Sequence, residues 1–251
     1  MSADAAIVAQ GLTRAFDDVV AVDGVDLSVP KGSVFGFLGP NGAGKSTTGR
    51  LLVGLLKPTS GTIRILGLDP DVDTLALRRQ IGVIPDGAPL FERLSGREYL
   101  TFVGRMHKLP AAEIDRRAGE LLGLLDLEGA ADKLIADYSH GMRKKVALSG
   151  ALIHGPRVVF LDEPFEGVDP VAARTIRDLL TGLASREVTV FLTSHVLEIV
   201  DRLCTDVAIL GGGKILVSGK LADLKATGTL EEVFLRTVGG GHEGAKLSWI
   251  T

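Results

Sequence analysis

Val34 to Thr47 reads VFGFLGPNGAGKST, an apolar run that leads into a glycine-rich turn and then a helical pattern. The turn fits G-x-x-x-x-G-K-[ST] in the strand–loop–helix setting in which that pattern binds phosphate. Its glycines let successive backbone N–H groups curl around a phosphate, and the N-terminus of the following helix adds a partial positive charge. Lys45 can reach the β- and γ-phosphates, and the Ser46 hydroxyl can ligate Mg²⁺. The stretch therefore predicts a nucleotide site formed by Gly39, Pro40, Asn41, Gly42, Ala43, Gly44, Lys45, Ser46 and Thr47.

Short β-branched runs alternate with helical patterns on both sides of this turn, which predicts an α/β fold. Several runs are continuously apolar, as expected for strands buried on both faces of a parallel sheet. The predicted strands are Ala6–Ala9, Val25–Val29, Val34–Leu38, Thr62–Leu66, Ile81–Ile84, Val158–Leu161, Val188–Thr193, Val207–Leu210 and Ile215–Val217. The predicted helices are Lys45–Leu56, Val171–Ala184 and Val196–Leu203.

The middle third of the chain differs, because between Ser95 and Gly155 no strand is indicated and apolar residues follow helical spacing. We therefore predict one domain over residues 1–237, in which a helical subdomain at about 92–155 interrupts a core at about 1–91 and 156–237. The strands before Lys31, together with Thr62–Leu66, are expected to form an antiparallel flank. Residues 238–251 are expected to form a loose tail.

The composition excludes several classes of protein. The 251 residues are 45% hydrophobic and 24% charged, which excludes disordered and fibrous chains. A net charge of −3 gives no support to a surface that neutralises nucleic-acid phosphates, so no nucleic-acid partner is expected. One cysteine, Cys204, cannot form an internal disulfide, which favours a reducing compartment. The longest stretch without charged residues, Gly32 to Gly44, is too short to span a bilayer, and the N-terminus lacks a secretory pattern. We therefore expect a soluble, intracellular protein.

Two acidic residues and a histidine follow buried strands downstream. Val158–Leu161 delivers Asp162 and Glu163 to its C-terminal end, where Asp162 can hold Mg²⁺ through water and Glu163 can polarise the attacking water. His195 closes the Val188–Thr193 strand, which we expect to neighbour the Asp162 strand. From this position His195 either contacts the γ-phosphate or is an ordinary polar group at a strand end.

These residues, together with the segment Tyr138-Ser139-His140-Gly141-Met142, resemble the ATP-binding cassette (ABC) ATPases. The segment is similar to the signature motif of that family, usually LSGGQ, in the SHGM form found among ATPases that drive ABC-2-type exporters. The resemblance covers roughly residues 5–237 and includes the P-loop, helical insertion, signature, Walker B acids, D-loop and switch histidine in that order. It implies a P-loop NTPase (RecA-like) core with an antiparallel β flank and a helical subdomain insertion.

The resemblance also implies roles for individual residues. Two cassettes would dimerise head to tail, so that Ser139 and Gly141, and the D-loop residue Asp169, act on ATP in trans. Ser139 also fits the start of a helix, which its side chain would cap. Phe16 lies where the family places an aromatic ring that stacks on adenine, although a core phenylalanine is the alternative. His195 becomes the switch histidine and Glu163 the general base.

Two positions depart from the family pattern. Asp86 replaces the usual glutamine after Ile84-Pro85, and it either binds Mg²⁺ through water or only shapes the loop that senses the partner. His140 replaces a glycine of the signature and either contacts the γ-phosphate or faces solvent. The following run, Arg143-Lys144-Lys145, is interpreted as a solvated helix face, with partner docking as the alternative.

The combined interpretation is an ATP-hydrolysing subunit of an ABC transporter, with ATP and Mg²⁺ as cofactors. It would dimerise around two Mg-ATP, as a homodimer or with a sister cassette, and drive a permease on a separate chain from the cytoplasmic face of the membrane. Export over import is implied by the resemblance alone. Candidate permease contacts are Phe91, Arg93, Leu94 and Tyr99. The alternative is a soluble ABC ATPase in iron–sulfur assembly, DNA or ribosome-linked work.

Overall fold

The computed structural model describes residues 4–87 and 89–239, and its centre is a six-stranded sheet. The strand order is β5-β6-β7-β3-β8-β9, in which every pair is parallel except β8–β9. These strands are β3 (Val34–Leu38), β5 (Ile81–Ile84), β6 (Val158–Asp162), β7 (Thr189–Ser194), β8 (Asp206–Gly211) and β9 (Lys214–Lys220). All five residues of β3 are buried, as its apolar run predicts. The parallel α/β core expected from the sequence is confirmed.

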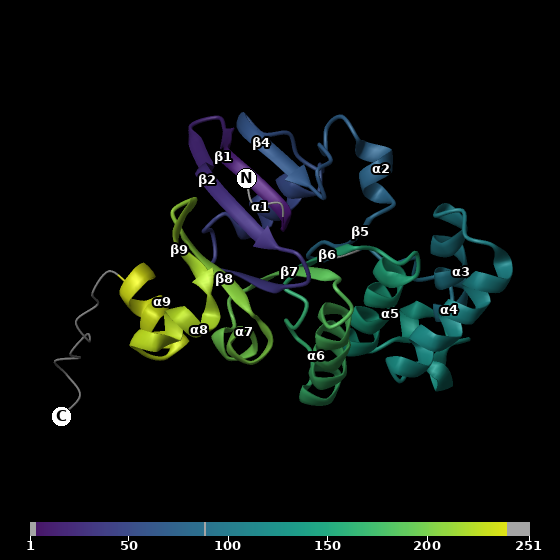
Figure 1. Cartoon of the computed structure of the whole chain (residues 1–251). Coiled ribbons are helices and arrows are strands. Elements are labelled where there is room, and N and C mark those ends of the chain that lie inside the picture. The colour runs from purple at the N-terminus through teal and green to yellow at the C-terminus, as the bar shows by residue number, and fades with distance from the viewer. Residues whose placement is uncertain (1–3, 88, 240–251) are drawn as a thin grey trace, which may run out of the picture.

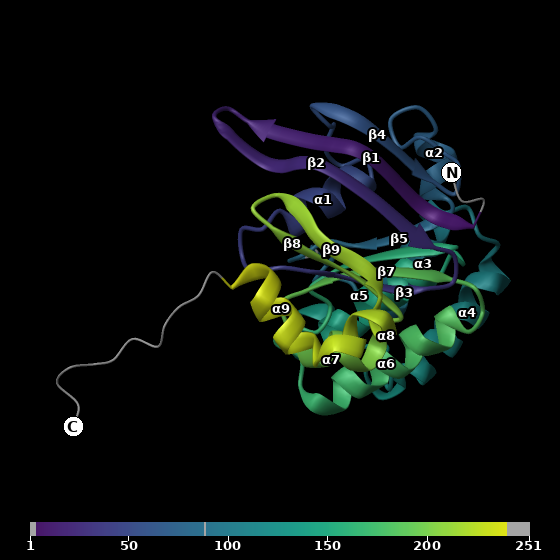
Figure 2. The same ribbon diagram turned by 60° about the vertical axis from the view of Figure 1, so that its left-hand side comes forward.

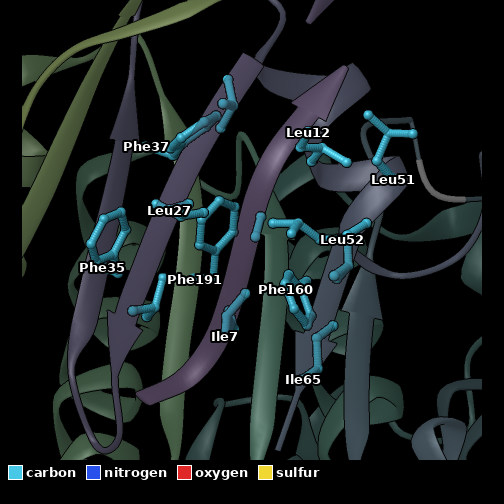
Figure 3. Close-up of a cluster of buried hydrophobic side chains, with 14 of the residues drawn as sticks. Ile7, Leu12, Leu27, Phe35, Phe37, Leu51, Leu52, Ile65, Phe160 and Phe191 are labelled. Carbon is cyan, nitrogen blue, oxygen red and sulfur yellow. The ribbon is translucent and has the colours of Figure 1, made fainter. Parts of the chain in front are cut away.

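A second, antiparallel sheet of order β2-β1-β4 lies over one face of this core, as Figure 2 shows. Its strands are β1 (Ala5–Phe16), β2 (Val19–Pro30) and β4 (Ser60–Ile65). Ile7, Leu12 and Leu27 point from it toward Phe35, Phe160 and Phe191 of the central sheet in one buried cluster (Figure 3). Helix α1 (Lys45–Leu52) adds Leu51 and Leu52 to the same cluster, so the flank and the nucleotide loop's helix share one core.

The strands of the flank are longer than the sequence predicts. The prediction stops one strand at Ala9, whereas β1 continues to Phe16 through a register shift between Ala9 and Leu12. Gly11 lies in this shift with a φ of 56°, and its N–H donates to Asp26 Oδ1 at 2.8 Å. The irregularity breaks the period-two alternation from which a strand is recognised.

Helices occupy the middle third of the chain and lie together at one side of the molecule (Figure 1). They are α3 (Gly96–Met106), α4 (Ala111–Leu124) and α5 (His140–Leu152), with single turns at Glu128–Ala130 and Ile135–Asp137. They enclose a core of their own that includes Leu100, Ile114 and Leu122. Helix α5 also touches β5 closely, because a Cβ at Gly82 would lie 2.3 Å from the Ala151 carbonyl oxygen. The predicted helical insertion is therefore confirmed, and α5 joins it to the central sheet.

The remaining helices cover the other face of the central sheet, opposite the flank (Figure 2). Helix α2 (Thr74–Arg78) is the exception (Figure 1), because its Leu77 belongs to the buried cluster on the flank side. The helices on the other face are α6 (Pro170–Ala184), α7 (Leu197–Leu203), α8 (Leu221–Leu224), a turn at Lys225–Thr227 and α9 (Leu230–Val238). Of these, α6, α7, α8 and α9 supply buried residues to the core on that face. Helix α1 ends at Leu52 rather than at the predicted Leu56, because Gly54 follows with a φ of 71°.

Within residues 4–87 and 89–239, no helix combines the length and apolar character that a membrane crossing requires. Helix α9 ends at Val238, so the predicted tail, 238–251, starts one residue too early, and residues 240–251 lie outside the described residues.

Candidate nucleotide-binding site

The glycine-rich turn connects β3 to α1 and takes conformations that favour glycine. Gly42 and Gly44 have φ values of 80° and 100°, and Gly44 directly precedes α1. A Cβ at Gly44 would lie only 2.4 Å from the Ala21 carbonyl oxygen, so the β2 backbone closes one side of the turn. The Lys45 side chain is 7% exposed and folds over the turn, donating to the carbonyl oxygens of Gly39 at 2.8 Å and Pro40 at 3.3 Å.

Asp162 lies at the C-terminal end of β6 and is joined to the turn through two hydroxyl groups. Ser46 Oγ donates to Asp162 Oδ1 at 3.2 Å, and Thr193 Oγ1 donates to the same oxygen. Thr193 belongs to β7, which lies between β6 and β3 in the sheet. Its hydroxyl is therefore placed between the strand that ends in Asp162 and the strand that precedes the glycine-rich turn. The sequence analysis did not assign Thr193 to the site.

Glu163 follows immediately and is held from several sides. Its N–H donates to Thr193 Oγ1 at 3.0 Å, and its carboxylate oxygen Oε1 lies 3.0 Å from His195 Nδ1 and 3.6 Å from Lys45 Nζ. The Glu163 side chain is 12% exposed. Its backbone has a φ of 45°, in the left-handed region that residues with a Cβ seldom occupy. The predicted adjacency of the His195 and Asp162 strands is confirmed by the β6–β7 pairing.

Lys45, Glu163 and His195 line a cleft of about 300 Å³. Its walls are Ala21, Asn41 to Thr47, Asp86, Glu163, Glu166 and His195. Asp86 is exposed and stands on the turn after β5, so the structure brings it to the cleft together with Ser46 and Glu163. The predicted site residues that do not line this cleft are Phe16, Gly39, Pro40, Ser139, Gly141, Asp162 and Asp169, although Asp162 reaches Ser46 of the turn through a hydrogen bond.

Phe16 ends β1 and is 40% exposed, which excludes the alternative of a core phenylalanine. The Arg14 guanidinium lies 4.4 Å from the centre of its ring, a cation–π arrangement. Arg14 also donates to the Lys57 carbonyl oxygen at 3.1 Å, which fixes the guanidinium against the ring.

The signature segment starts helix α5. Ser139 caps it, because its Oγ accepts the Met142 N–H at 3.2 Å, as the sequence predicts. Gly141 lies beside Asp169 of the same chain, since a Cβ at Gly141 would be 3.1 Å from Asp169 Oδ2. Asp169 caps α6, and the hydrogen bond from the Ala172 N–H holds the pKa of its carboxyl below the ordinary value. The signature and the D-loop therefore form one continuous surface.

The interpretation of Arg143-Lys144-Lys145 as a solvated helix face is wrong. Lys145 is buried and its Nζ lies 3.7 Å from Asp126 Oδ2, and Arg143 donates to the Tyr138 and Ala136 carbonyl oxygens. Lys144 is half-buried and donates to the Glu163 carbonyl oxygen at 3.1 Å. Helical spacing explains the burial of Lys145, because it shares a face of α5 with the apolar positions 148 and 152.

His140 is exposed, in agreement with the alternative that it faces solvent, and it also makes a contact that the sequence does not predict. Its Nε2 lies 3.1 Å from the Glu166 carbonyl oxygen of the same chain. Since a carbonyl only accepts, Nε2 carries the proton in this contact. His140 therefore contacts the turn that follows β6.

Comparison with known proteins agrees with this geometry. A family model described as ABC transporter matches residues 22–166. The daunorubicin resistance ATP-binding protein DrrA3 of Streptomyces coeruleorubidus is 40% identical over 239 residues, which cover 94% of this chain and 76% of that protein. The Nod factor export ATP-binding protein I of Sinorhizobium fredii is 37% identical over 217 residues, covering 86% of this chain and 63% of that protein.

Among solved structures, the ATP-binding subunit of an ABC transporter aligns with a TM-score of 0.86 and 29% identity, covering 92% of this chain and 98% of that one. The α/β cassette fold, the nucleotide loop and the relatives agree: the chain belongs to the ABC transporter family, as an ATP-binding subunit that hydrolyses ATP to drive transport.

Proposed function

We propose that two copies of this chain close around two Mg-ATP and power export through a permease on a separate chain, from the cytoplasmic face of the membrane. The observation that supports this most directly is the composition of the cleft. It holds the phosphate-binding turn, Glu163 and His195, whereas the signature residues Ser139 and Gly141 lie outside it. A second chain is therefore needed to bring a signature to the ATP.

Within one chain the residues take complementary roles. Backbone N–H groups of the turn bind the β-phosphate, and Lys45 neutralises the β- and γ-phosphates. Glu163 accepts the proton of the attacking water as general base. His195 holds Glu163 through Nδ1, which leaves Nε2 for the γ-phosphate. Phe16 stacks on adenine, with Arg14 supporting its other face.

Mg²⁺ fits two oxygen donors at the junction of the nucleotide turn and β6. Ser46 Oγ and Asp162 Oδ1 are hard oxygen donors 3.2 Å apart, the ligand type that Mg²⁺ takes from proteins alongside water and phosphate oxygens. When bound, Mg²⁺ neutralises charge that develops on the β- and γ-phosphate oxygens. Asp86 faces the same cleft, and we place it as a water-mediated contact.

The partner chain supplies the other half of each site. The N-terminus of α5, which Ser139 caps and whose first turn contains Gly141, presents N–H groups suited to the γ-phosphate of the partner's ATP. Asp169 lies beside Gly141 and so reaches the same interface. Because one chain carries both halves, a homodimer is sufficient, although a sister cassette would also fit.

Export is supported by the relatives, whose names state daunorubicin resistance and Nod factor export. Phe91, Arg93, Leu94 and Tyr99 are our candidate permease contacts. Phe91 is 53% exposed and packs edge-on against exposed Phe102 with ring centres 5.0 Å apart, an apolar pair open to a partner.

The substitution Glu163→Gln tests the proposal. The variant is expected to bind ATP, to lose hydrolysis by about 10²-fold or more, and to accumulate as an ATP-bound dimer, because the site closes but has no base. ATPase assays and size-exclusion chromatography with and without ATP measure both effects. Turnover at the wild-type rate would refute Glu163 as the base, and a monomer at saturating ATP would refute closure around nucleotide.

A further inference from the structure

Two hydrogen bonds join the first turns of α5 to the turn that follows β6 in the same chain. Lys144 Nζ donates to the Glu163 carbonyl oxygen at 3.1 Å, and His140 Nε2 donates to the Glu166 carbonyl oxygen at 3.1 Å. We call this pair of contacts the α5 clamp. It links the helical subdomain, which carries the signature, to the strand that carries the catalytic acids.

The clamp acts on a residue with an unfavourable backbone conformation. A residue with a Cβ at a φ of 45° persists only where the surroundings hold it there. The Glu163 N–H is fixed by Thr193 of the central sheet, and its carbonyl also accepts the Glu166 N–H at 3.2 Å. The contact from Lys144 is different in origin, because it comes from the helical subdomain. The backbone orientation of Glu163 thus depends partly on the position of α5 relative to the central sheet.

Helix α5 is also the element that starts at Ser139. Lys144 follows the cap by little more than one turn, and a hydrogen-bonded helix moves as a unit over that length. A displacement of the Ser139 end would therefore move Lys144 and the carbonyl that it holds. Neighbouring Arg143 points elsewhere, to the Tyr138 and Ala136 carbonyl oxygens and to Glu92, and so provides a matched control on the same helix.

We propose that Lys144, supported by His140, is a positioning residue for Glu163, through which the signature of one ATP site sets the general base of the other. The inference rests on the proposed function, because it requires a dimer in which Ser139 and Gly141 meet the partner's ATP. Each chain then contains a mechanical link of a few residues between the two sites. Lys144 itself touches no phosphate in this scheme.

The first test compares three variants in steady-state ATPase assays. Lys144→Ala is expected to lower kcat about tenfold while KM for ATP stays within about twofold, because Glu163 is misplaced but ATP binding is intact. Lys144→Arg should recover most of kcat, since a guanidinium can donate to the same carbonyl. Arg143→Ala should leave both constants near wild type. Equal losses from Lys144→Ala and Arg143→Ala, or a loss that resides in KM, would overturn the proposal.

The second test assigns the effect to one chain of the dimer. A mixed dimer, purified through two different tags, carries Glu163→Gln on one chain and so retains one competent site. Lys144→Ala on the chain with intact Glu163 should lower the remaining turnover about tenfold, whereas on the Glu163→Gln chain it should leave it unchanged. The reverse pattern would show that Lys144 acts on the ATP across the interface, and equal losses would show a general structural role; either refutes the inference.

If the mixed dimer with Glu163→Gln on one chain has no turnover before Lys144 is changed, the proposal is tested by the comparison of Lys144→Ala, Lys144→Arg and Arg143→Ala. Failure of the proposed function itself would be seen earlier and separately, as hydrolysis by the Glu163→Gln homodimer or as the absence of an ATP-dependent dimer.

Discussion

Asp86 is an exposed carboxylate on the turn after β5, and it shares the cleft with Ser46 and Glu163. If it reaches Mg²⁺ through water, Asp86→Ala removes one hydrogen bond to a metal-bound water, a loss of about 1 kcal/mol. The Mg²⁺ concentration for half-maximal ATP hydrolysis should then rise about fivefold. A titration of ATPase activity with Mg²⁺ at fixed ATP measures it. Asp86→Gln, which keeps an oxygen at that place, should lie close to wild type, and an unchanged Mg²⁺ dependence of Asp86→Ala would exclude a metal role.

Single residues also show which parts of the candidate site can be predicted from the sequence. Gly39 to Thr47 could be predicted because the turn is contiguous in sequence. Its backbone conformation requires glycine at particular positions, so the pattern is visible locally. Thr193 could not, because its role depends on the β6–β7 register that places it opposite Asp162. The contact of Lys144 could not be predicted either, since its partner Glu163 lies 19 residues away on another element.

At the scale of elements, two histidines connect the ends of α3 and α5. The rings of His107 and His154 stack with centres 3.8 Å apart, and His154 Nε2 donates to the Ile81 carbonyl oxygen of β5 at 3.0 Å. Burial, followed by the neighbouring His107 and Arg117 charges, lowers the pKa of His154 to about 4. His154 Nδ1 is buried without a hydrogen-bond partner, so a second proton there would be unsatisfied.

This stack predicts how stability depends on pH. The folded pKa lies below the unfolded value of 6.5, so the unfolded chain takes up a proton first as the pH falls. The His154 contribution is therefore complete above pH 6.5 and is lost between pH 6.5 and about 4. Because the ring is only half-buried and partly screened, the expected loss is about 1–2 kcal/mol. Urea unfolding at pH 7 and pH 5 should show it, and His154→Gln should reduce the difference by that amount. A variant with the wild-type pH dependence would contradict the assignment.

Elements differ in how well the sequence predicts them. Strand β3 has the predicted bounds because it is buried along its whole length and reads as one apolar run. Strands β1 and β2 were predicted too short, because Gly11 and Gly24, both at positive φ, interrupt the pattern of the flank. The helical subdomain was recognised from its spacing, whereas the contacts of α5 with β5 and with the β6 turn are properties of the tertiary fold.

At the scale of the whole molecule, the proposed active site is divided between two chains. The cleft of one chain contains Lys45 and Glu163, and the exposed cap of α5 at Ser139 lies outside it. If ATP is hydrolysed only between two chains, a variant with an inactive phosphate-binding turn and a variant with an inactive signature should restore ATPase activity when they form a mixed dimer. If a single chain were sufficient, mixing would restore nothing. The ATPase activity of mixed dimers therefore tests the head-to-tail arrangement.

Lys45→Ala removes the phosphate-binding lysine, and Ser139→Arg fills the exposed signature cap with a side chain too large for a closed interface. Each homodimer should be inactive, since both of its sites lack one half. Mixed dimers contain one site in which both halves are intact, so an equimolar mixture should regain about a quarter of the wild-type rate if half of the dimers are mixed. ATPase assays before and after mixing measure this. Loss of the Ser139 cap costs about 1 kcal/mol, so each variant is first checked for its unfolding midpoint. No recovery from two folded variants would place both halves of the site in one chain and refute the head-to-tail dimer.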